Sequence, residues 1–389
     1  MNIAYVMRYW PIYGGGETIT VTLANELVKR GHNVYVIYTF DKLCTPMPYE
    51  VDNRILSYKA YTIERFKHED VSHLHEYIKN KRIDIMINQW GSTELCYKAR
   101  IGTNCKLITC WHLDVLRKFD MPTDFKKKIL YHVLGKDKYQ KYTYWLQMKE
   151  HDKNYRLSDK YIFLSNSFLH EYLNQTTIKI DMNKVGAISN PLTYDDYYDM
   201  DLYDTKKKEV LFVGRIYEYH KRLSYVLRIW KKIEDIPELD EWKLTIVGDG
   251  QDMLSVKALA KGLNLKRVSF EGFKNSRPYY EKSSVFMMTS AFEGFGMTLV
   301  EAQQYGVVPI AMDSYKSLHD ILENDKNGII VPNNDLNAYV DELKDLMSNE
   351  KRRKRLAIKG LETCGKFSID AIVTQWEGLF NNLINHNEK

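Results

Sequence analysis

Short apolar runs rich in β-branched residues recur along the chain, and each is followed by a stretch whose apolar residues have helical spacing. This alternation is typical of βαβ units, in which parallel strands are buried on both faces by helices. One set of runs covers residues 2–7, 33–39, 84–89, 106–111, 160–165 and 185–189, and a second covers 210–214, 244–248, 268–272, 285–290, 307–312 and 328–331. The sequence therefore predicts an α/β protein with two parallel sheets of the Rossmann type.

Two domains follow from the length and from a change of composition between the two sets. The chain has 389 residues, enough for two domains that each bury their own core. Residues 193–209, TYDDYYDMDLYDTKKKE, are acidic and then basic and contain few aliphatic residues, which is typical of an interdomain connection. We expect a first domain over 1–192, a second over 205–366, and a helix within 367–389.

Charge and cysteine content exclude several classes of protein. The formal net charge is +5, too small for a chain of this length to indicate a nucleic acid as partner. The five cysteines are scattered and form no Cys-x-x-Cys pair, so neither a disulfide framework nor a structural zinc site is expected. No run approaches the ~18 apolar residues of a membrane span. The expected location is the cytoplasm.

Positive charge gathers between Val115 and Leu157, where eleven Lys or Arg stand against five Asp or Glu, together with five of the 29 Tyr. Basic side chains interleaved with aromatic ones suit a surface that faces anionic lipid headgroups. Two interpretations stay open: a surface for the inner face of the cell membrane or a lipid-linked acceptor, and a pair of solvated helices with aromatic side chains turned inward. A second basic cluster, KRRKR at 351–355, is expected to be a solvated helix face.

Candidate binding residues follow the predicted strands, because parallel sheets bind ligands beyond the carboxyl ends of their strands. Gly14, Gly15 and Gly16 come after the first run and before a predicted helix at 18–30. A glycine turn before a helix lets the backbone approach an anionic group. A dinucleotide fingerprint would need a small residue where Ile19 stands, so a phosphate- or sugar-approaching loop and a plain tight turn both remain open.

Two basic residues follow the first strand of the second half. Arg215 comes directly after VLFVG, and Lys221 stands six residues further on. A guanidinium fork and a compact ammonium charge together suit the neutralisation of a diphosphate leaving group. Two solvated surface charges are the alternative.

Two acidic residues, Glu293 and Glu301, bracket Gly294, Gly296 and the start of a predicted helix near Met297. The glycines indicate a loop before the helix, so the two carboxylates can address different parts of one extended ligand. The N–H groups of the turn and of the helix N-terminus lie between them and could receive phosphates. The alternative is a loop charge and a helix-surface acid.

Together these motifs resemble those of the family 4 retaining glycosyltransferases, which have the GT-B fold. Five features stand in that family's order: the glycine loop at 14–17, SNP at 189–191, the Arg/Lys pair, EGFGMTLVEA with its Glu-x7-Glu spacing, and NGIIV at 327–331. The likeness spans nearly the whole chain. It implies two facing Rossmann-like domains with a central cleft, and a C-terminal helix that crosses back to the N-terminal, acceptor-side domain.

The resemblance also implies roles for individual residues. Arg215 and Lys221 would hold the donor diphosphate. Glu301 would bind the ribose hydroxyls, and Glu293 the hydroxyls of the transferred sugar. His112, at the end of the run 106–111, resembles the family histidine near the reacting sugar and the acceptor. Further donor-binding positions are expected at Gly15, Gly16, Phe273, Phe295, Gly296, Met297 and Thr298.

The implied activity is the transfer of a sugar from a UDP- or GDP-sugar, with retained configuration, to a saccharide or lipid-linked acceptor in the biosynthesis of a bacterial capsule or lipopolysaccharide. No cofactor or metal is expected beyond the nucleotide-sugar co-substrate. Asp199-Met200-Asp201 has the form of an Asp-x-Asp metal motif but lies in the predicted connection. The alternatives are an epimerase or phosphorylase of the same fold, and a non-catalytic subunit that binds sugar nucleotides or polysaccharide.

Overall fold

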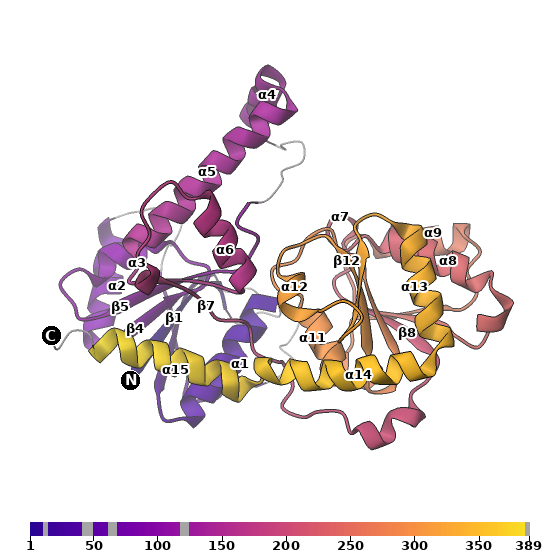
Figure 1. Cartoon of the computed structure of the whole chain (residues 1–389). Coiled ribbons are helices and arrows are strands. Elements are labelled where there is room, and N and C mark those ends of the chain that lie inside the picture. The colour runs from indigo at the N-terminus through magenta and orange to yellow at the C-terminus, as the bar shows by residue number, and fades with distance from the viewer. Residues whose placement is uncertain (11–14, 41–49, 61–67, 117–123, 386–389) are drawn as a thin grey trace. The chain divides into compact units, whose positions relative to one another are not determined.

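The chain forms two compact units, each built around a parallel sheet (Figure 1). The computed structural model describes residues 1–10, 15–40, 50–60, 68–116 and 124–385. The first unit is Met1–Ser189 together with Ile372–Lys389, and the second is Asn190–Ala371. Each unit has its own apolar core, in agreement with the two sets of apolar runs.

The described residues of the first unit form a sheet of seven parallel strands in the order β3-β2-β1-β4-β5-β6-β7. The bounds are β1 (Asn2–Tyr9), β2 (Asn33–Phe40), β3 (Leu56–Lys59), β4 (Ile85–Asn88), β5 (Lys106–Trp111), β6 (Lys160–Phe163) and β7 (Val185–Ala187). All six predicted strands are present. Sequence reasoning missed β3, because this edge strand is mostly exposed and its LSYK sequence makes no apolar run.

Helices cover both faces of this sheet because its strands carry apolar side chains on both sides (Figure 1). On one face, strand residues such as Ala4, Val6 and Met86 pack against α2 and α3. Figure 1 shows α1 and α15 on the other face. The bounds are α1 (Gly15–Lys29), α2 (His68–Asn80), α3 (Thr93–Arg100), α6 (Asn166–Gln175) and α15 (Ile369–Asn385).

A helical arm, which we define as α4 (Phe125–Leu134) and α5 (Lys136–Leu157), projects from the first unit (Figure 1). Its base is fixed by His151, which is fully buried on α5 and bonds the Tyr161 hydroxyl at 2.6 Å and the Val115 carbonyl at 3.0 Å. Gly135, with φ of 74°, connects the two helices. No residue of α4 is buried, so this helix packs far less than the base does.

The second unit has six parallel strands within the described residues, in the order β10-β9-β8-β11-β12-β13. Their bounds are β8 (Glu209–Val213), β9 (Lys243–Val247), β10 (Val268–Gly272), β11 (Val285–Met288), β12 (Val308–Asp313) and β13 (Ile329–Pro332). The helices are α7 (Glu218–Lys221), α8 (Leu223–Glu234), α9 (Met253–Gly262), α10 (Arg277–Lys282), α11 (Met297–Gln304), α12 (Leu318–Ile321), α13 (Leu336–Ser348) and α14 (Glu350–Cys364). All six strands predicted for the second half are present.

The strand order reverses once in each sheet, between β1 and β4 in the first unit and between β8 and β11 in the second. At such a switch point the connections leave in opposite directions, which opens a crevice beyond the carboxyl ends of the two central strands. The fold therefore points to two places for ligands: the residues after β1 and β4, and those after β8 and β11.

Residues 193–209 do not form a free connection between the units, because they pack onto the second unit. Tyr203 is buried in its core, and the Lys206 ammonium donates to the carbonyls of Tyr280, Glu281 and Ser283 at 2.9–3.1 Å. Lys206 thereby satisfies the last carbonyls of α10. Polar composition alone does not reveal these contacts.

The C-terminal helix α15 is held on the first unit by apolar and charged contacts. Trp376 and Phe380 are 4% and 0% exposed. Glu377 accepts from Arg30 Nη1 at 2.7 Å and lies 2.9 Å from His32 Nε2. Helix α15 begins at Ile369, in the second unit, and its residues from Ile372 onward belong to the first unit. The helix therefore passes from the second unit to the first, as the resemblance implied.

Replacing Phe380 by Ala should lower the free energy of unfolding of the first unit by about 3–5 kcal/mol, because a fully buried aromatic ring would leave a cavity. Urea unfolding followed by fluorescence measures this change. Asn382→Ala, at an exposed position of the same helix, is the matched control and should shift stability by less than ~0.5 kcal/mol. Equal stability of Phe380→Ala and wild type would show that α15 contributes little to the unit.

Candidate active site

Glycines bring the loops after β8 and β9 into backbone contact at the switch point of the second sheet. A Cβ on Gly248 would lie 1.9 Å from the Gly214 carbonyl oxygen, and one on Gly250 would lie 2.3 Å from that of Ile216. The Gly214 N–H donates to Val247 O at 3.0 Å, and the Ile216 N–H to Asp249 O at 2.9 Å. Sequence reasoning missed Gly248 and Gly250, although the triplet GDG after a predicted strand was a signal for them.

The loop after β8 is also tied to the end of β11. Thr289 Oγ1 donates to the carbonyl of Lys221 at 2.9 Å, and the Ala291 N–H donates to that of His220 at 2.8 Å. Arg222 follows in the left-handed conformation, with φ of 48°, and ends the short helix α7. The Lys221 side chain is therefore fixed opposite the residues that follow β11.

Lys221 and Glu293, two of the predicted site residues, form a buried ion pair. Lys221 Nζ lies 2.5 Å from Glu293 Oε1, and the two side chains are 12% and 10% exposed. Ser290 Oγ donates to the same carboxylate oxygen at 2.6 Å. His220 Nε2 lies 3.9 Å from Glu293 Oε2. The Glu293 carboxylate thus has a counter-charge and a hydroxyl donor, which a buried charge requires.

Opposing effects set the pKa of Glu293. Burial removes water from the carboxylate and so works to raise the pKa. The charges of Lys221 and His220, with hydrogen bonds from Lys221 and Ser290, favour the ionised form and outweigh burial, so the pKa lies below its ordinary value. Glu293 is therefore ionised at neutral pH and cannot act there as a general acid.

Arg215 lies near this pair but differs from it in exposure. Its guanidinium is exposed and forms no ion pair with the described residues, while its positive charge helps to lower the pKa of His220. Burial is the main cause of that lowered pKa. An exposed guanidinium beside a lysine at a switch point has donors available for an anionic ligand. The structure thus brings together Arg215, Lys221 and Glu293.

The second predicted acid, Glu301, lies on α11 and is 8% exposed. Thr193 Oγ1 donates to Glu301 Oε1 at 2.8 Å, and the Tyr280 hydroxyl donates to Oε2 at 3.1 Å. Burial raises the pKa of Glu301, and these two hydrogen bonds only partly oppose it. Sequence reasoning missed Thr193 and Tyr280, because nothing in either segment marks a side chain that bonds a distant acid.

The turn before α11 has the geometry predicted for it. Gly296 has φ of 97°, a conformation that favours glycine, and a Cβ there would lie 2.6 Å from the Tyr315 hydroxyl. Met297 and Thr298 begin the helix and are half-buried. Phe295 is a core residue, since it is 3% exposed and packs edge-on against Phe367. Only its backbone is therefore available to a ligand.

In the first unit, His112 follows β5 and is stacked against Trp90, which follows β4. The ring centroids are 4.6 Å apart with planes at 23°. Burial lowers the pKa of His112 to about 4, so its imidazole is neutral at pH 7. His112 Nε2 is buried and has no hydrogen-bond partner among the described residues.

The glycines after β1 are placed differently from the prediction. Helix α1 begins at Gly15 rather than at residue 18, so Gly15 and Gly16 form its first turn, while Gly14 lies outside the described residues. A Cβ on Gly16 would lie 2.6 Å from Trp90 Nε1, whereas one on Gly15 would meet nothing within 4 Å. Glu17 adds a negative charge to the same first turn. At Gly16 the absent side chain leaves room for Trp90.

The predicted donor-binding residue Phe273 and the Asp-x-Asp residue Asp199 both lie on exposed surface. Phe273, just after β10, is 47% exposed. Asp199 accepts from the Asp201 N–H at 3.0 Å and so caps a 3₁₀ turn, Met200–Thr205. That bond gives Asp199 a structural role. Among the described residues no three His, Cys, Asp or Glu side chains form a group that could hold a metal ion.

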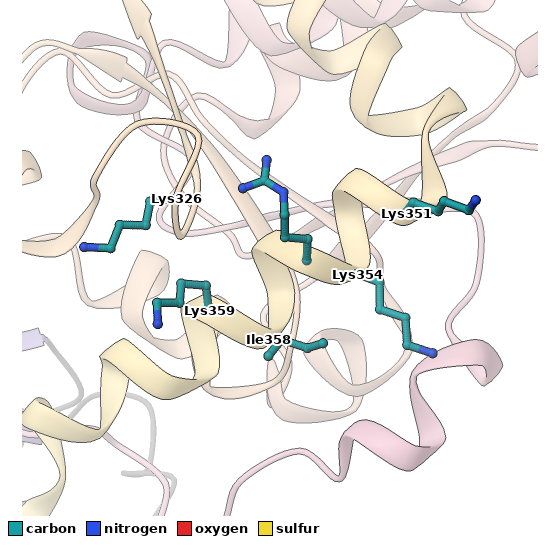
Figure 2. A pocket seen from close by; sticks show the side chains of 6 residues that line it. Lys326, Lys351, Lys354, Ile358 and Lys359 are labelled. Carbon is teal, nitrogen blue, oxygen red and sulfur yellow. The ribbon is translucent and has the colours of Figure 1, made fainter.

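A cavity of about 640 Å³ lies beside α14, lined by Lys326, Lys351, Lys354, Arg355, Ile358 and Lys359 (Figure 2). The lysines at 326, 354 and 359 are paired with carboxylates at 2.5–2.8 Å. Figure 2 shows that the charged ends of Lys326, Lys351 and Lys354 point in different directions. The cavity therefore lacks the converging free donors of an anion site.

The basic cluster at 351–355 was only partly predicted. Arg353 is 8% exposed and donates to the carbonyls of Leu346 and Met347, at the end of α13. Arg352 pairs with Glu342 and Asp345 of the same helix. The prediction of a solvated face was wrong for Arg353, which fastens α13 to α14.

Comparison with known families identifies the family of this chain. The model for group 1 glycosyl transferases matches residues 201–363, and that for glycosyltransferase family 4 matches residues 13–192. The two matches together cover most of both units, in the expected order. The chain belongs to the family 4 glycosyltransferases of GT-B type. In this glycosyltransferase, residues 201–363, which the group 1 model matches, include Arg215, Lys221, Glu293 and Glu301.

Relatives and solved structures agree with this family. The amylovoran biosynthesis glycosyltransferase AmsD of Erwinia amylovora is 26% identical over 95% of this chain and 96% of its own. A Campylobacter jejuni α-1,4-N-acetyl-D-galactosaminyltransferase, named for an undecaprenol-linked substrate, is 24% identical over 93% of this chain and 94% of its own. Sucrose-phosphate synthase of Thermosynechococcus elongatus has the same fold, with a TM-score of 0.76 and 18% identity over 99% of both chains.

The Lys221–Glu293 pair makes a stability prediction. Lys221→Ala should lower the free energy of unfolding of the second unit by about 3–5 kcal/mol, because it leaves a buried carboxylate without its counter-charge. The double variant Lys221→Ala with Glu293→Gln should recover much of this loss. Urea unfolding at pH 7 measures both variants.

The stabilisation that this ion pair provides depends on pH with a defined sign. Since the pKa of folded Glu293 is lowered, the pair stabilises the wild type above the unfolded-state pKa of about 4.3, and this contribution is lost as the pH falls through the folded-state value. The stability difference between wild type and Lys221→Ala should therefore shrink on acidification. A difference that stays constant from pH 7 to pH 3 would contradict the assigned ion pair.

Proposed function

We propose that this glycosyltransferase moves a sugar from a nucleoside-diphosphate sugar to a saccharide or lipid-linked acceptor, with retained configuration and without a metal ion. The observation that supports the proposal most is the buried Lys221–Glu293 pair beside the exposed Arg215. These groups offer two positive charges and one fixed carboxylate at the switch point of the second sheet, which matches a diphosphate joined to a sugar.

Each group has a role that fits its surroundings. Arg215 and Lys221 bind the diphosphate, and Glu293, ionised at neutral pH, accepts hydrogen bonds from hydroxyls of the transferred sugar. The Glu301 carboxylate already accepts two hydroxyl groups, and its remaining lone pairs are available to the ribose hydroxyls. The N-terminal turn of α11 adds backbone N–H donors for phosphate oxygens.

In the reaction the bond from the anomeric carbon to the diphosphate oxygen breaks, and the acceptor hydroxyl oxygen bonds to that carbon on the same face. The hydroxyl proton passes to the leaving diphosphate, so no enzyme carboxylate needs to become a covalent nucleophile. Negative charge grows on the leaving group, and Arg215 and Lys221 stabilise it more in the transition state than in the ground state. In the first unit, the neutral His112 imidazole can form a hydrogen bond with a hydroxyl group of a bound sugar.

The names of relatives support the acceptor class. AmsD is named for amylovoran biosynthesis, and the Campylobacter jejuni enzyme for a sugar chain on a diphospho-undecaprenol. We infer a role in the biosynthesis of a bacterial surface polysaccharide, with a lipid-linked saccharide as acceptor.

The reaction is tested by incubating the purified protein with UDP- and GDP-sugars and saccharide acceptors in the presence of EDTA. Transfer should occur with one base class, and NMR of the product should show the donor's anomeric configuration in the new linkage. An inverted linkage would contradict retention. Activity that EDTA abolishes and Mn²⁺ restores would contradict metal independence, and interconversion of free donor sugars would indicate an epimerase.

A variant tests the assigned role of Arg215 in the same assay. Arg215→Ala should lower kcat/KM by about 10²–10³-fold, since one transition-state donor is lost, while the free energy of unfolding changes little because the guanidinium is exposed. Lys261→Ala, at an exposed position on α9, is the control. Near-wild-type turnover of Arg215→Ala would show that Arg215 is not part of the active site.

A lipid-linked acceptor requires access to a membrane, and the helical arm supplies a suitable surface. None of the helices in the described part of the chain is long and apolar enough to span a bilayer. On α4 the side chains of Phe125, Ile129 and Val133 repeat every fourth residue and are 76%, 50% and 76% exposed. Lysines 126–128 are exposed on the same helix. We propose that this face of α4 docks on anionic lipid headgroups.

Flotation with liposomes tests this surface. The wild type should float with vesicles that contain anionic lipid and less with neutral ones, because each lysine near the surface contributes about 1 kcal/mol. Replacing the three α4 lysines by Glu, which reverses their charge, should abolish flotation. Reversing Lys257, Lys261 and Lys266, which are exposed in the second unit, makes the same change of net charge as a control. Equal flotation of both triple variants would contradict docking through α4.

A further inference from the structure

Trp90 is an exposed aromatic side chain at the switch point of the first sheet. It follows β4, the central strand next to β1, and is 39% exposed. Large apolar side chains are usually buried, and ligands of parallel sheets bind beyond the carboxyl ends of strands at this point. An exposed indole at this edge of the sheet is therefore available to a ligand.

The indole is fixed on two sides by residues of the first unit. His112 stacks against it with ring centroids 4.6 Å apart. At one edge of the ring the backbone of Gly16 approaches so closely that a Cβ would lie 2.6 Å from Trp90 Nε1 and 3.1 Å from Cε2 and Cζ2. Helix α1 therefore accommodates the ring only because residue 16 has no side chain. A ring held in this way presents its exposed part without much loss of conformational freedom on binding.

Two buried polar atoms in the residues directly after β4 and β5 lack partners among the described residues. One is Oε1 of Gln89, which neighbours Trp90 in the chain and is 6% exposed as a residue. The other is Nε2 of His112. Buried polar atoms without hydrogen bonds are costly, so such atoms at a ligand-binding edge indicate groups that a ligand satisfies.

These observations fit the chemistry of one ligand class. A pyranose ring has an apolar C–H face that can cover an indole, and hydroxyl groups around its edge that both donate and accept hydrogen bonds. The Gln89 amide oxygen needs a donor, and a neutral imidazole nitrogen can pair with a hydroxyl. A nucleobase also stacks on indole, and the test below treats it as an outcome that would overturn the proposal.

We propose that Trp90 is the stacking platform of a pyranose subsite in the first unit, with Gln89 and His112 bonding the sugar hydroxyls and Gly16 leaving room for the indole. The subsite binds a sugar of the saccharide acceptor. This inference rests on the proposed function for the identity of its ligand. The side chain of Trp90 contacts the acceptor sugar and has no part in the proton transfer.

The subsite is tested by direct binding without donor or turnover, so its failure is distinguishable from failure of the proposed transfer. The probes are methyl glycosides of common hexoses and N-acetylhexosamines, with saturation-transfer-difference NMR and Trp fluorescence as readouts. Wild type should bind at least one glycoside saturably. Trp90→Ala should raise its Kd by about tenfold, and Trp90→Phe by less, because a phenyl ring retains part of the stacking face.

A double-mutant cycle tests the link to Gly16. Gly16→Ala should raise the glycoside Kd in the same direction, because its Cβ displaces the indole. The variant with both Gly16→Ala and Trp90→Ala should bind no more weakly than Trp90→Ala alone. Ile101→Ala, an exposed apolar position at the end of α3 in the same unit, is the control and should leave the Kd within twofold.

Four results would overturn the proposal. They are wild type without saturable glycoside binding, Trp90→Ala with a Kd within twofold of wild type, additive effects of the Gly16 and Trp90 substitutions, and a Trp90→Ala effect on the Kd of UDP or GDP instead of the glycoside. The last would assign the indole to a nucleobase. Circular dichroism of each variant keeps the comparison to folded protein, and Trp90→Phe remains informative if Trp90→Ala does not fold.

Discussion

The buried ion pair between Lys221 and Glu293 is the interaction on which the donor site depends. It joins the loop after β8 to the loop after β11, the two strands on either side of the switch point. Two charges with side chains 12% and 10% exposed are an expensive arrangement for a domain that needs only stability. The same pair gives a diphosphate and a sugar hydroxyl group each a fixed partner of opposite polarity, so its cost is consistent with a binding role.

Close backbone approach supports this pair. Glycines at 248 and 250 let the loops after β8 and β9 touch, and Thr289 and Ala291 bond the carbonyls of α7. The first unit uses the same device, since Gly16 leaves room for Trp90 beside His112. In each unit the residues around the switch point are positioned by backbone contacts that a side chain would prevent.

The fold could be predicted from sequence because its main determinant, the alternation of buried strands and helices, is local and recurs twelve times. The edge strand β3 was not predicted, because its mostly exposed residues make no apolar run. For the segment 193–209, polar composition does not reveal that Lys206 bonds three carbonyls at the end of α10. Likewise, Arg353 is buried although it lies in a basic cluster.

For the candidate site, sequence could name residues but not their contacts. Spacing and family resemblance marked Arg215, Lys221, Glu293 and Glu301, yet only the structure pairs Lys221 with Glu293, and Glu301 with Thr193 and Tyr280. Trp90 was overlooked because a single aromatic residue after a strand has no motif. The sequence left a phosphate- or sugar-approaching loop and a plain tight turn open for the glycines after β1, and it did not reveal that Gly16 leaves room for the indole of Trp90.

The central claim is that Arg215 and Lys221 bind the diphosphate of a nucleotide-sugar donor at the switch point of the second sheet. A crystal structure of the protein with UDP or GDP, whichever binds, tests this claim most directly. We predict diphosphate oxygens within hydrogen-bond distance of both side chains, beside the N-terminal turn of α11. A diphosphate bound away from Arg215 and Lys221, with the Lys221–Glu293 pair untouched, would contradict it.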